Sequence, residues 1–360
     1  MVIIVITHLP SPYQVEFFNA ISNRSEVDLS IIYLLNSSSE RSWSASTVLH
    51  KSLVLDNDAS AFAEAAKLVG QADLVVFNYY NDQQALCLME DRATSRKPWV
   101  FWGERPGFRH PTLGKWARRW RLRWLHQSPI PIWGIGGFGV DGYQAEFGHA
   151  REYRNLPYFS DLGRFSNCSR SPRLPGAPRV ILYSGSLIHR KGVDLLAQAF
   201  KVVAQEFPNV VLRVMGNGVL RSEMERVLRP LSSQVEFLGF KDWQELPEVY
   251  AAADVLCVPS RHDGWGLVVP EGLASGIPVI ATNRMGAAID LIVSGENGWL
   301  IEAGNLGGLV PALREAACLS PEELQRMSGN ARLVAQNHSL DQGVTRFLSG
   351  SYEAAAKWGH

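Results

Sequence analysis

Two carboxylates separated by seven residues, Asp263 and Glu271, carry the clearest chemical signal in this chain. They lie in residues 262–274, His-Asp-Gly-Trp-Gly-Leu-Val-Val-Pro-Glu-Gly-Leu-Ala, a pattern that predicts a strand passing into a helix. Turns of this kind, at the carboxyl edge of an open α/β sheet, bind ligands, and the start of a helix offers unpaired N–H groups that suit phosphate. Gly264 and Gly266 would let the main chain approach a ligand closely. Glu271 could accept hydrogen bonds from both hydroxyls of a ribose.

A second segment combines a glycine turn with cations. Residues 179–192 are Arg-Val-Ile-Leu-Tyr-Ser-Gly-Ser-Leu-Ile-His-Arg-Lys-Gly, which predicts a buried strand, a turn at Gly185 and Ser186, and a helix from about Val193. Main-chain donors followed by positive charge are what a pyrophosphate needs. Taken alone, the segment could equally be a solvated helix start.

Three further apolar runs complete an alternation of strands and helices. Residues 211–218 predict a strand followed by Gly-Asn-Gly, in which Gly216 could lie close to a nucleotide; an ordinary turn is the alternative. Residues 235–240 and 253–260 predict two more strands. This order predicts a doubly wound nucleotide-binding domain.

These segments resemble the retaining glycosyltransferases of family 4, the glycosyl transferases group 1. Asp263-x7-Glu271 is similar to the Glu-x7-Glu motif of that family, with an aspartate one methylene shorter in the first position, and Gly-Ile-Pro-Val-Ile-Ala-Thr at 276–282 follows it. The glycine turn resembles the family's Gly-Arg-Leu-x-x-x-Lys-Gly segment, with Lys191 in the lysine position and Ser186 in place of arginine. The resemblance covers residues 178–305.

The resemblance implies an α/β protein of the GT-B fold, with two facing doubly wound Rossmann-like domains and a cleft between them. We expect an acceptor-binding domain at 1–164, a proline-rich linker at 165–178 and a nucleotide-sugar-binding domain at 179–338. A helix in 339–360 is expected to cross back to the first domain. Strands of the first domain are predicted at residues 2–6, 29–34, 74–77, 99–102 and 130–135.

The resemblance also implies a donor, a nucleotide-diphosphate sugar, with UDP favoured and GDP as the alternative base. Asp263 would bind hydroxyls of the donor sugar, Lys191 would neutralise the leaving diphosphate, and Glu104 would act on the acceptor. No metal is expected, because cations and main-chain amides can stabilise the leaving group. The donor-binding residues are predicted to be Glu271, Arg190, Ser186, Gly185, Gly216, Gly264, Trp265, Gly266 and Leu267.

Glu104 lies in the loop 101–107, Phe-Trp-Gly-Glu-Arg-Pro-Gly, after a predicted strand. Many family members have a histidine in the corresponding loop. Glu104 could orient the acceptor hydroxyl or the donor sugar, and Arg105 could hold phosphate. The alternative is a local salt bridge between the two, which would stabilise little.

Residues 96–126 contain nine Lys or Arg and one acid. Trp116, Trp120 and Trp124 recur every four residues and would share one face of a helix. We favour packing of these tryptophans on the sheet, with the arginines in solvent. The alternative is that 109–126 lies in an anionic membrane surface, which would suit a lipid-linked acceptor.

The composition limits the remaining functions. The chain has 360 residues, 46% of them hydrophobic, and a net charge of zero, so we expect no nucleic acid partner. The first residues predict a core strand without the marks of a secretory signal, and no run is long enough for a membrane span. Four scattered cysteines fit a reducing cytoplasm. Gly134-x-Gly136-x-x-Gly139 predicts a turn at a strand end and no dinucleotide site.

The function expected is therefore metal-independent, retaining transfer of a sugar to a hydroxyl of a glycan, a lipid-linked glycan or a small molecule, in bacterial surface polysaccharide biosynthesis. The location expected is the cytoplasm, with peripheral contact at the inner face of the membrane. Two alternatives remain: a nucleotide-sugar epimerase, and a non-catalytic nucleotide-sugar-binding scaffold subunit.

Overall fold

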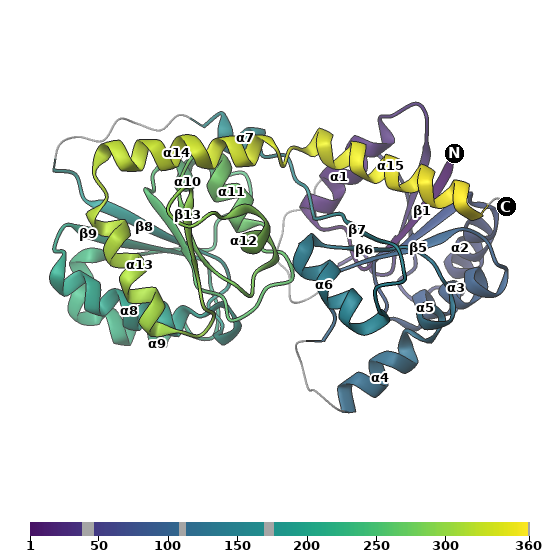
Figure 1. Ribbon diagram of the computed structural model, residues 1–360, viewed down its shortest axis with the longest axis horizontal. Coiled ribbons are helices and arrows are strands. Elements are labelled where there is room, and N and C mark those ends of the chain that lie inside the picture. Colours follow the sequence, from purple (N-terminus) through teal and green to yellow (C-terminus); the bar gives the residue numbers. More distant parts are fainter. Residues whose placement is uncertain (38–46, 108–112, 169–175, 359–360) are drawn as a thin grey trace. The chain divides into compact units, whose positions relative to one another are not determined.

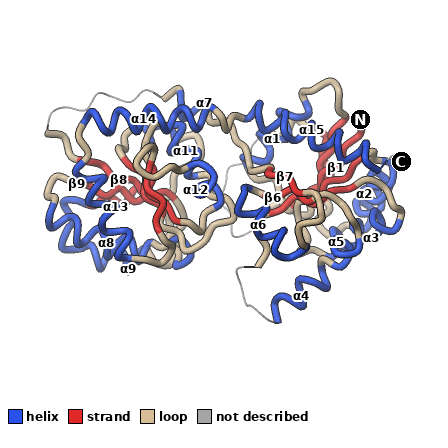
Figure 2. The backbone as a smooth tube through the Cα atoms, viewed as in Figure 1, coloured by secondary structure: helices blue, strands red, loops and turns tan. Residues whose placement is uncertain are grey.

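The computed structural model describes residues 1–37, 47–107, 113–168 and 176–358, and the chain forms two compact units. Unit 1 comprises Met1–Asp161 together with Ser339–His360, and unit 2 comprises Leu162–His338. Each unit is a parallel sheet with helices packed around it (Figures 1 and 2). The last helix of the chain therefore belongs to the same unit as the first strand.

Unit 1 contains a seven-stranded parallel sheet in the order β3-β2-β1-β4-β5-β6-β7. The chain moves outward from β1 on one side and returns to β4 on the other, so β1 and β4 form the switch point of a doubly wound sheet. The strands are β1 (Val2–Thr7), β2 (Asp28–Tyr33), β3 (Lys51–Val54), β4 (Leu74–Phe77), β5 (Trp99–Gly103), β6 (Ile132–Gly134) and β7 (Tyr153–Asn155).

Two helices of unit 1, α2 and α3, begin directly after aspartates that cap them. The Asp58 and Asp82 side chains accept hydrogen bonds from main-chain N–H groups of the first turns that follow them. Phe347, in the last helix, packs edge-on against Phe17 with ring centroids 5.9 Å apart. The helices are α1 (Pro12–Ser22), α2 (Ala59–Gln71), α3 (Gln83–Thr94), α4 (Leu113–Arg121), α5 (Arg123–Gln127), α6 (Gly136–Phe147) and α15 (Leu340–Trp358).

Unit 2 contains a six-stranded parallel sheet in the order β10-β9-β8-β11-β12-β13, with its switch point between β8 and β11. Its strands are β8 (Arg179–Ser184), β9 (Val210–Met215), β10 (Val235–Gly239), β11 (Val255–Val258), β12 (Val279–Thr282) and β13 (Gly298–Ile301). Its helices are α7 (Gly163–Ser166), η1 (His189–Lys191), α8 (Val193–Glu206), α9 (Arg221–Leu228), η2 (Arg229–Gln234), α10 (Leu246–Ala251), α11 (Val268–Ala274), α12 (Gly286–Leu291), α13 (Leu306–Cys318) and α14 (Pro321–Gln336).

Two parallel, doubly wound sheets confirm the α/β class predicted from the sequence. Four strands, β3, β7, β12 and β13, were not predicted, because each has only three or four residues and gives a weak periodic signal. The predicted linker lies partly outside the described residues. Its first residue, Phe165, is buried in α7 against Tyr250. Gly134 ends β6 and Gly136 begins α6, so the Gly-x-Gly-x-x-Gly segment spans the turn at this strand end and the first turn of the helix.

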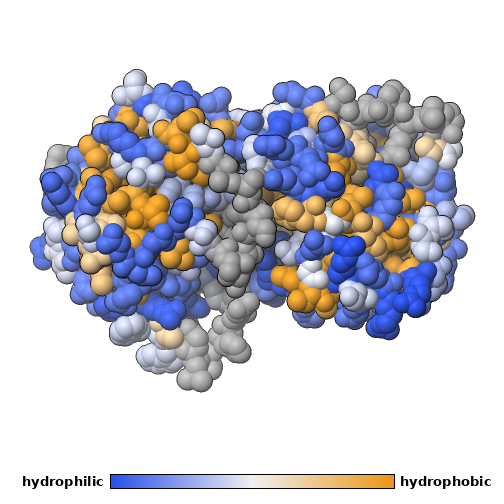
Figure 3. All heavy atoms as spheres, turned by 180° about the vertical axis from the view of Figure 1, so that it is seen from behind, coloured by the Kyte–Doolittle hydropathy of each residue, from blue (hydrophilic) through white to orange (hydrophobic). Residues whose placement is uncertain are grey.

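The apolar residues of both units are gathered mainly in their interiors. On the face drawn in Figure 3, hydrophilic residues are interrupted by smaller apolar patches. None of the helices within the described ranges is long and apolar enough to cross a bilayer.

A buried histidine in unit 1 should make stability depend on pH. His50 is 5% exposed, contacts the Tyr33 hydroxyl at 3.0 Å, and burial lowers its pKa from 6.5 to about 4. Between these values the unfolded chain binds a proton that the folded chain excludes. The free energy of unfolding is therefore expected to rise with pH by up to about 1.4 kcal/mol per unit in this window. Chemical denaturation at pH 4.5 to 7 should show a smaller slope for His50→Gln than for the wild type; equal slopes would contradict the prediction.

Candidate functional site

Three loops meet at the switch point of the unit 2 sheet, and they approach each other closely. Gly185, after β8, has φ +144°, and Gly216, after β9, has φ +131°, in the range that favours glycine. A Cβ atom on Gly216 would lie 1.9 Å from the carbonyl oxygen of Gly185. The Tyr183 hydroxyl donates to the carbonyl oxygen of Ser186 at 2.8 Å, which fixes the turn between them. Gly216 is thus required by main-chain contact between the two loops, and Gly185 is favoured by its φ angle.

Arg261, just after β11, holds the short helix η1 that carries the predicted phosphate-binding cations. Its main-chain N–H donates to the Arg190 carbonyl oxygen at 2.8 Å, and its guanidinium donates to the His189 carbonyl oxygen at 2.7 Å. The same guanidinium forms a two-pronged ion pair with Asp194 of α8, with both N–O distances at 2.7 Å. Gly192 closes η1 with φ +71°, where a Cβ atom would lie 2.0 Å from the Pro259 carbonyl oxygen.

The predicted sugar-binding carboxylate and the predicted phosphate-binding lysine contact each other. Lys191 Nζ lies 2.5 Å from Asp263 Oδ2, and Arg190 Nη1 lies 3.7 Å from Asp263 Oδ1. The Lys191 and Asp263 side chains are about 16% and 15% exposed. Burial alone would raise the pKa of Asp263, but the Lys191 ammonium and the more distant Arg190 outweigh it and hold this pKa below its usual value. Asp263 is therefore an ionised, largely buried hydrogen-bond acceptor.

Glu271 lies in the first turn of α11, as the sequence predicted for the helix start. The Tyr250 hydroxyl, from α10, donates to Glu271 Oε2 at 3.1 Å. Tyr250 is fully buried, and burial together with the Glu271 charge raises its pKa well above the usual value. It is therefore a permanent hydrogen-bond donor that fixes the Glu271 carboxylate, a role that the sequence analysis missed.

The segment between the two carboxylates is held against the rest of unit 2. Gly266 has φ +90°, and a Cβ atom there would lie 2.7 Å from the Met285 side chain. Gly264 and Leu267 lie on either side of this turn and lead into α11. The Trp265 side chain is only 1% exposed and stacks on His338 with ring centroids 5.5 Å apart. Any contact of Trp265 with a ligand in this conformation would come from its main chain.

The remaining predicted site residue, Glu104, lies in unit 1. It directly follows β5 and lines a cavity of about 300 Å³ at the carboxyl ends of β1, β4 and β5. The Tyr143 hydroxyl donates to the Glu104 carbonyl oxygen at 2.8 Å. Arg105 packs its guanidinium 4.2 Å from the centre of the Phe138 ring. Each unit thus places predicted site residues at its own switch point.

The expected packing of the basic tract was wrong for two of its tryptophans. The helix breaks at Leu122 into α4 and α5. Trp116 and Trp120 are 76% and 64% exposed, so they do not pack on the sheet. Arg118, expected in solvent, is largely buried and forms an ion pair with Glu146 at 2.9 Å. Helical spacing correctly placed the tryptophans on one side of α4, but it could not tell which side faces the unit. Residues 109–112 of this tract lie outside the described residues.

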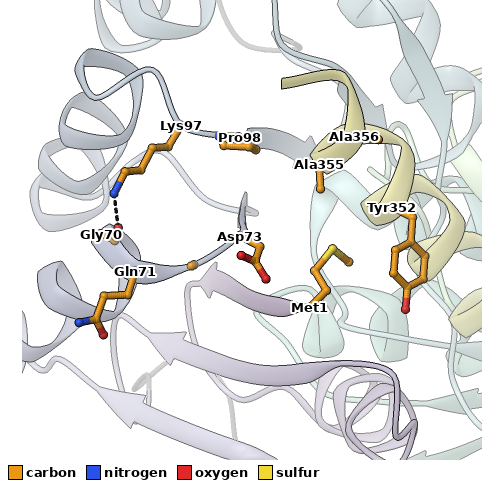
Figure 4. A pocket seen from close by; sticks show the side chains of 10 residues that line it. Met1, Gly70, Gln71, Asp73, Lys97, Pro98, Tyr352, Ala355 and Ala356 are labelled. Atoms are coloured by element: carbon orange, nitrogen blue, oxygen red, sulfur yellow. Dashed lines mark hydrogen bonds between the residues drawn. The ribbon is translucent and has the colours of Figure 1, made fainter. Parts of the chain in front are cut away.

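A larger cavity, about 630 Å³, opens at the opposite edge of the unit 1 sheet and is bordered by Tyr352 of α15 (Figure 4). Its polar groups already serve the fold. Asp73 accepts a hydrogen bond from the Val2 N–H at 2.7 Å, and Lys97 donates to the Gly70 carbonyl oxygen at 2.5 Å. It lies at the amino ends of the strands, away from both switch points, and contains none of the predicted site residues.

Residues 166–334 match the family model for glycosyl transferases group 1. This matched region, just under half of the chain, is similar to the glycosyl transferases group 1 family. The resemblance inferred from the sequence is thereby confirmed for the part of the chain that holds Lys191, Asp263 and Glu271. Unit 1 lies entirely outside the matched region.

Two curated relatives illustrate the similarity. A GDP-mannose-dependent monoacylated alpha-(1-6)-phosphatidylinositol monomannoside mannosyltransferase of Corynebacterium glutamicum is 30% identical over 186 residues, 45% of this chain and 48% of the relative. The lipopolysaccharide core biosynthesis glycosyltransferase LpsE of Rhizobium meliloti is 28% identical over 180 residues, 49% of this chain and 51% of the relative. The chain spans about half the length of the curated relatives it matches.

A solved structure is similar to this chain over both units. The crystal structure of Anabaena Alr3699/HepE in complex with UDP matches with a TM-score of 0.77 and 17% sequence identity, over 97% of this chain and 99% of that one. This similarity shows that the fold is GT-B.

Proposed function

We propose that this chain is a retaining glycosyltransferase that transfers a sugar from a nucleotide-diphosphate donor to a hydroxyl group. One observation carries the proposal: at the switch point of one sheet, Lys191 after β8 contacts Asp263 after β11, and Glu271 lies in the first turn of the helix that follows Asp263. A lysine for phosphate and two carboxylates for hydroxyls are the groups that a nucleotide sugar requires.

In the proposed mechanism, unit 2 binds the donor. Glu271, held by Tyr250, accepts hydrogen bonds from the ribose hydroxyls. Lys191 and Arg190 bind the diphosphate and neutralise the charge that develops as it leaves, which stabilises the transition state. Asp263 accepts hydrogen bonds from the sugar and fixes its anomeric carbon. The acceptor hydroxyl attacks from the face that the phosphate leaves, and the phosphate takes its proton. The cations supply the charge stabilisation, so the proposal requires no metal.

UDP is the proposed nucleotide of the donor, with GDP as the alternative. The Anabaena structure contains UDP, whereas the Corynebacterium glutamicum relative is GDP-mannose-dependent. The proposed acceptor is a glycan, a lipid-linked glycan or a small molecule that unit 1 binds through Glu104. A role in bacterial surface polysaccharide biosynthesis is supported by the name of the Rhizobium meliloti relative.

Thermal unfolding with nucleotides tests this function and separates it from its alternatives. A ligand that binds only the folded state raises the melting temperature by mass action. We expect UDP or GDP and their sugars to raise the melting temperature by the same amount in EDTA and in Mg²⁺. We also expect donor turnover to require an acceptor, and the transferred sugar to retain its anomeric configuration. Binding without turnover would favour the scaffold subunit, and interconversion of donor sugars would favour the epimerase.

Replacing Tyr250 by phenylalanine tests the support of Glu271. The hydroxyl is removed while the buried ring stays, so we expect UDP affinity to fall about fivefold, equivalent to about 1 kcal/mol, with kcat nearly unchanged. Affinity for 2′,3′-dideoxy-UDP should not change, because the effect acts through the ribose hydroxyls. Calorimetric titration measures both. Tyr33→Phe, which removes a buried hydroxyl from unit 1, is the matched control. If this control lost as much UDP affinity as Tyr250→Phe, the effect would come from general destabilisation.

The exposed face of α4 is the proposed site of peripheral membrane contact at the inner, anionic surface. Trp116 and Trp120 lie four residues apart, and Arg119 between them is exposed. Arg123 lies 4.9 Å from the Trp120 ring. The helix lies at the outside of its unit (Figure 1). Exposed tryptophans beside arginines suit the boundary between lipid headgroups and water.

Sedimentation with vesicles tests this contact. The chain is expected to bind vesicles that contain phosphatidylglycerol, and to lose this binding in the double variant Trp116→Ala with Trp120→Ala. Arg119→Gln should weaken vesicle binding about fivefold, because one cation near an anionic surface contributes about 1 kcal/mol to binding. Phe240→Ala, at an exposed apolar residue of unit 2, is the control. Equal binding by the double variant and the wild type would exclude α4 as the contact.

A further inference from the structure

The cavity at the switch point of unit 1 has the chemistry of a binding site in its own right. It measures about 300 Å³ and lies where β1, β4 and β5 end, which is where open sheets of this kind bind ligands. Thr7 and Gly103 are the last residues of β1 and β5, and Asn78 directly follows β4. The cavity is therefore built from residues of three neighbouring strand ends.

Neutral hydrogen-bonding groups form one part of its lining. Gln14 Nε2 donates to Asn78 Oδ1 at 2.9 Å and to Thr7 Oγ1 at 3.2 Å. Ser11 donates to Gln14 Oε1 at 2.9 Å, and Asn78 Nδ2 donates to the Trp102 carbonyl oxygen at 2.8 Å. Because Gln14 is 5% exposed and each amide has fixed partners, these groups are held in place before any ligand arrives.

Aromatic rings form another part of the lining. The His8 ring stacks on the Tyr79 ring with centroids 4.4 Å apart and an interplanar angle of 12°. The Tyr13 ring lies 5.0 Å from the Tyr158 ring. Such rings combine an apolar face with a polar edge. A sugar ring has the complementary character, since its C–H faces are apolar and its periphery carries hydroxyls.

The lining carries one carboxylate and one guanidinium, those of Glu104 and Arg105, and so presents no net charge to a ligand. Glu104 is exposed in the lining, and a carboxylate accepts hydrogen bonds from hydroxyls but repels anions. The Arg105 guanidinium packs on Phe138 and donates to its carbonyl oxygen at 3.2 Å. A further cation, Arg121, lies beside the cavity and donates to Oδ1 of its lining residue Asn81 at 3.1 Å.

The main chain positions Glu104 through a tight contact. A Cβ atom on Gly103 would lie 2.5 Å from the Tyr143 hydroxyl, which donates to the Glu104 carbonyl oxygen. Tyr143 is fully buried, so the start of this loop is fixed by the core of the unit.

We propose that this cavity binds an uncharged, polyhydroxylated sugar ring, with Glu104 accepting a hydrogen bond from one of its hydroxyls. The identification of this ring as the terminal residue of the acceptor rests on the proposed function. The binding of the ring to the cavity does not depend on it. Recognition of the ring requires no phosphate.

Ligand-observed NMR on the full chain, without nucleotide, tests the proposal with methyl glycosides of common hexoses and with the corresponding hexose 6-phosphates. We expect at least one methyl glycoside to bind and Glu104→Gln to weaken it about tenfold, as for loss of a hydrogen bond to a charged group. The same variant should improve binding of the 6-phosphate, which a purely structural role would not do. Glu64→Gln, at an exposed carboxylate of α2, should change neither. Binding of phosphorylated sugars alone, or of no glycoside, would overturn the proposal.

UDP binding in the same samples separates the two hypotheses. Loss of the glycoside signal with normal UDP binding would refute this inference and leave the proposed function standing. Glycoside binding without any nucleotide binding would refute the proposed function instead. Tyr79→Ala provides a second test, since loss of the stacking ring should weaken the glycoside while UDP binding stays normal; unchanged glycoside binding would place the ring elsewhere.

Discussion

Asp263→Asn is expected to lower kcat for sugar transfer by at least about a hundredfold, the usual effect of removing one charged or hydrogen-bonding group that acts on the transition state. The side chain keeps its size but loses its charge, so it accepts weaker hydrogen bonds from the sugar and no longer pairs with Lys191 at 2.5 Å. The Kd for UDP should change by less than about tenfold, because the nucleotide is bound mainly by other residues. Single-turnover rates and calorimetric titration separate the two quantities.

Asp242→Asn is a suitable control, because this carboxylate also belongs to unit 2 but lies after β10, outside the three site loops. A variant Asp263→Asn with wild-type kcat would remove Asp263 from catalysis. A loss of UDP binding as large as the loss in kcat would instead show that the residue organises the whole donor site.

Glu271→Ala is expected to act mainly on nucleotide binding. A carboxylate that accepts hydrogen bonds from ribose hydroxyls contributes about 1.5 to 3 kcal/mol, so the Kd for UDP should rise about 10- to 150-fold. The variant also leaves the buried Tyr250 hydroxyl without its Glu271 partner, which adds a loss of stability. The ribose contribution is isolated by a double-mutant cycle with 2′,3′-dideoxy-UDP.

In that cycle, wild type and Glu271→Ala should bind the dideoxy nucleotide with similar affinity. Glu271→Gln keeps the size of the side chain and the contact with Tyr250, and should give an intermediate Kd for UDP. An unchanged Kd for UDP in both variants would contradict the assignment of Glu271 to the ribose.

The sequence predicted the centre of unit 2 well because β8 and β11 are buried on both faces. Such strands are nearly continuous apolar runs, as in 180–183 and 255–258, and glycines mark the turns between them. The same signal was weak for β3, whose four residues are all partly or fully exposed. Predicted residues Lys191 and Asp263 came together because both follow neighbouring central strands.

Residues that support the site from a distance were not predictable in this way. Tyr250 and Asp194 have no spacing signal that connects them to Glu271 or Arg261, since the contacts depend on how helices pack in three dimensions. The Gln14 and Asn78 amides likewise meet only after two strand ends become neighbours. Exposure of Trp116 was missed for another reason: a helical repeat defines a face of the helix without saying what covers it.

The contact between Lys191 and Asp263 has a consequence for the release of product. Each of these groups would serve a different half of the donor, the lysine its phosphates and the aspartate its sugar. A complete donor offers both new partners at once. A spent nucleotide diphosphate attracts Lys191 but offers Asp263 nothing in return, and a largely buried carboxylate that loses its counter-charge is destabilised. The pair would therefore re-form most readily once the sugar has gone, favouring departure of the used nucleotide over that of the loaded one.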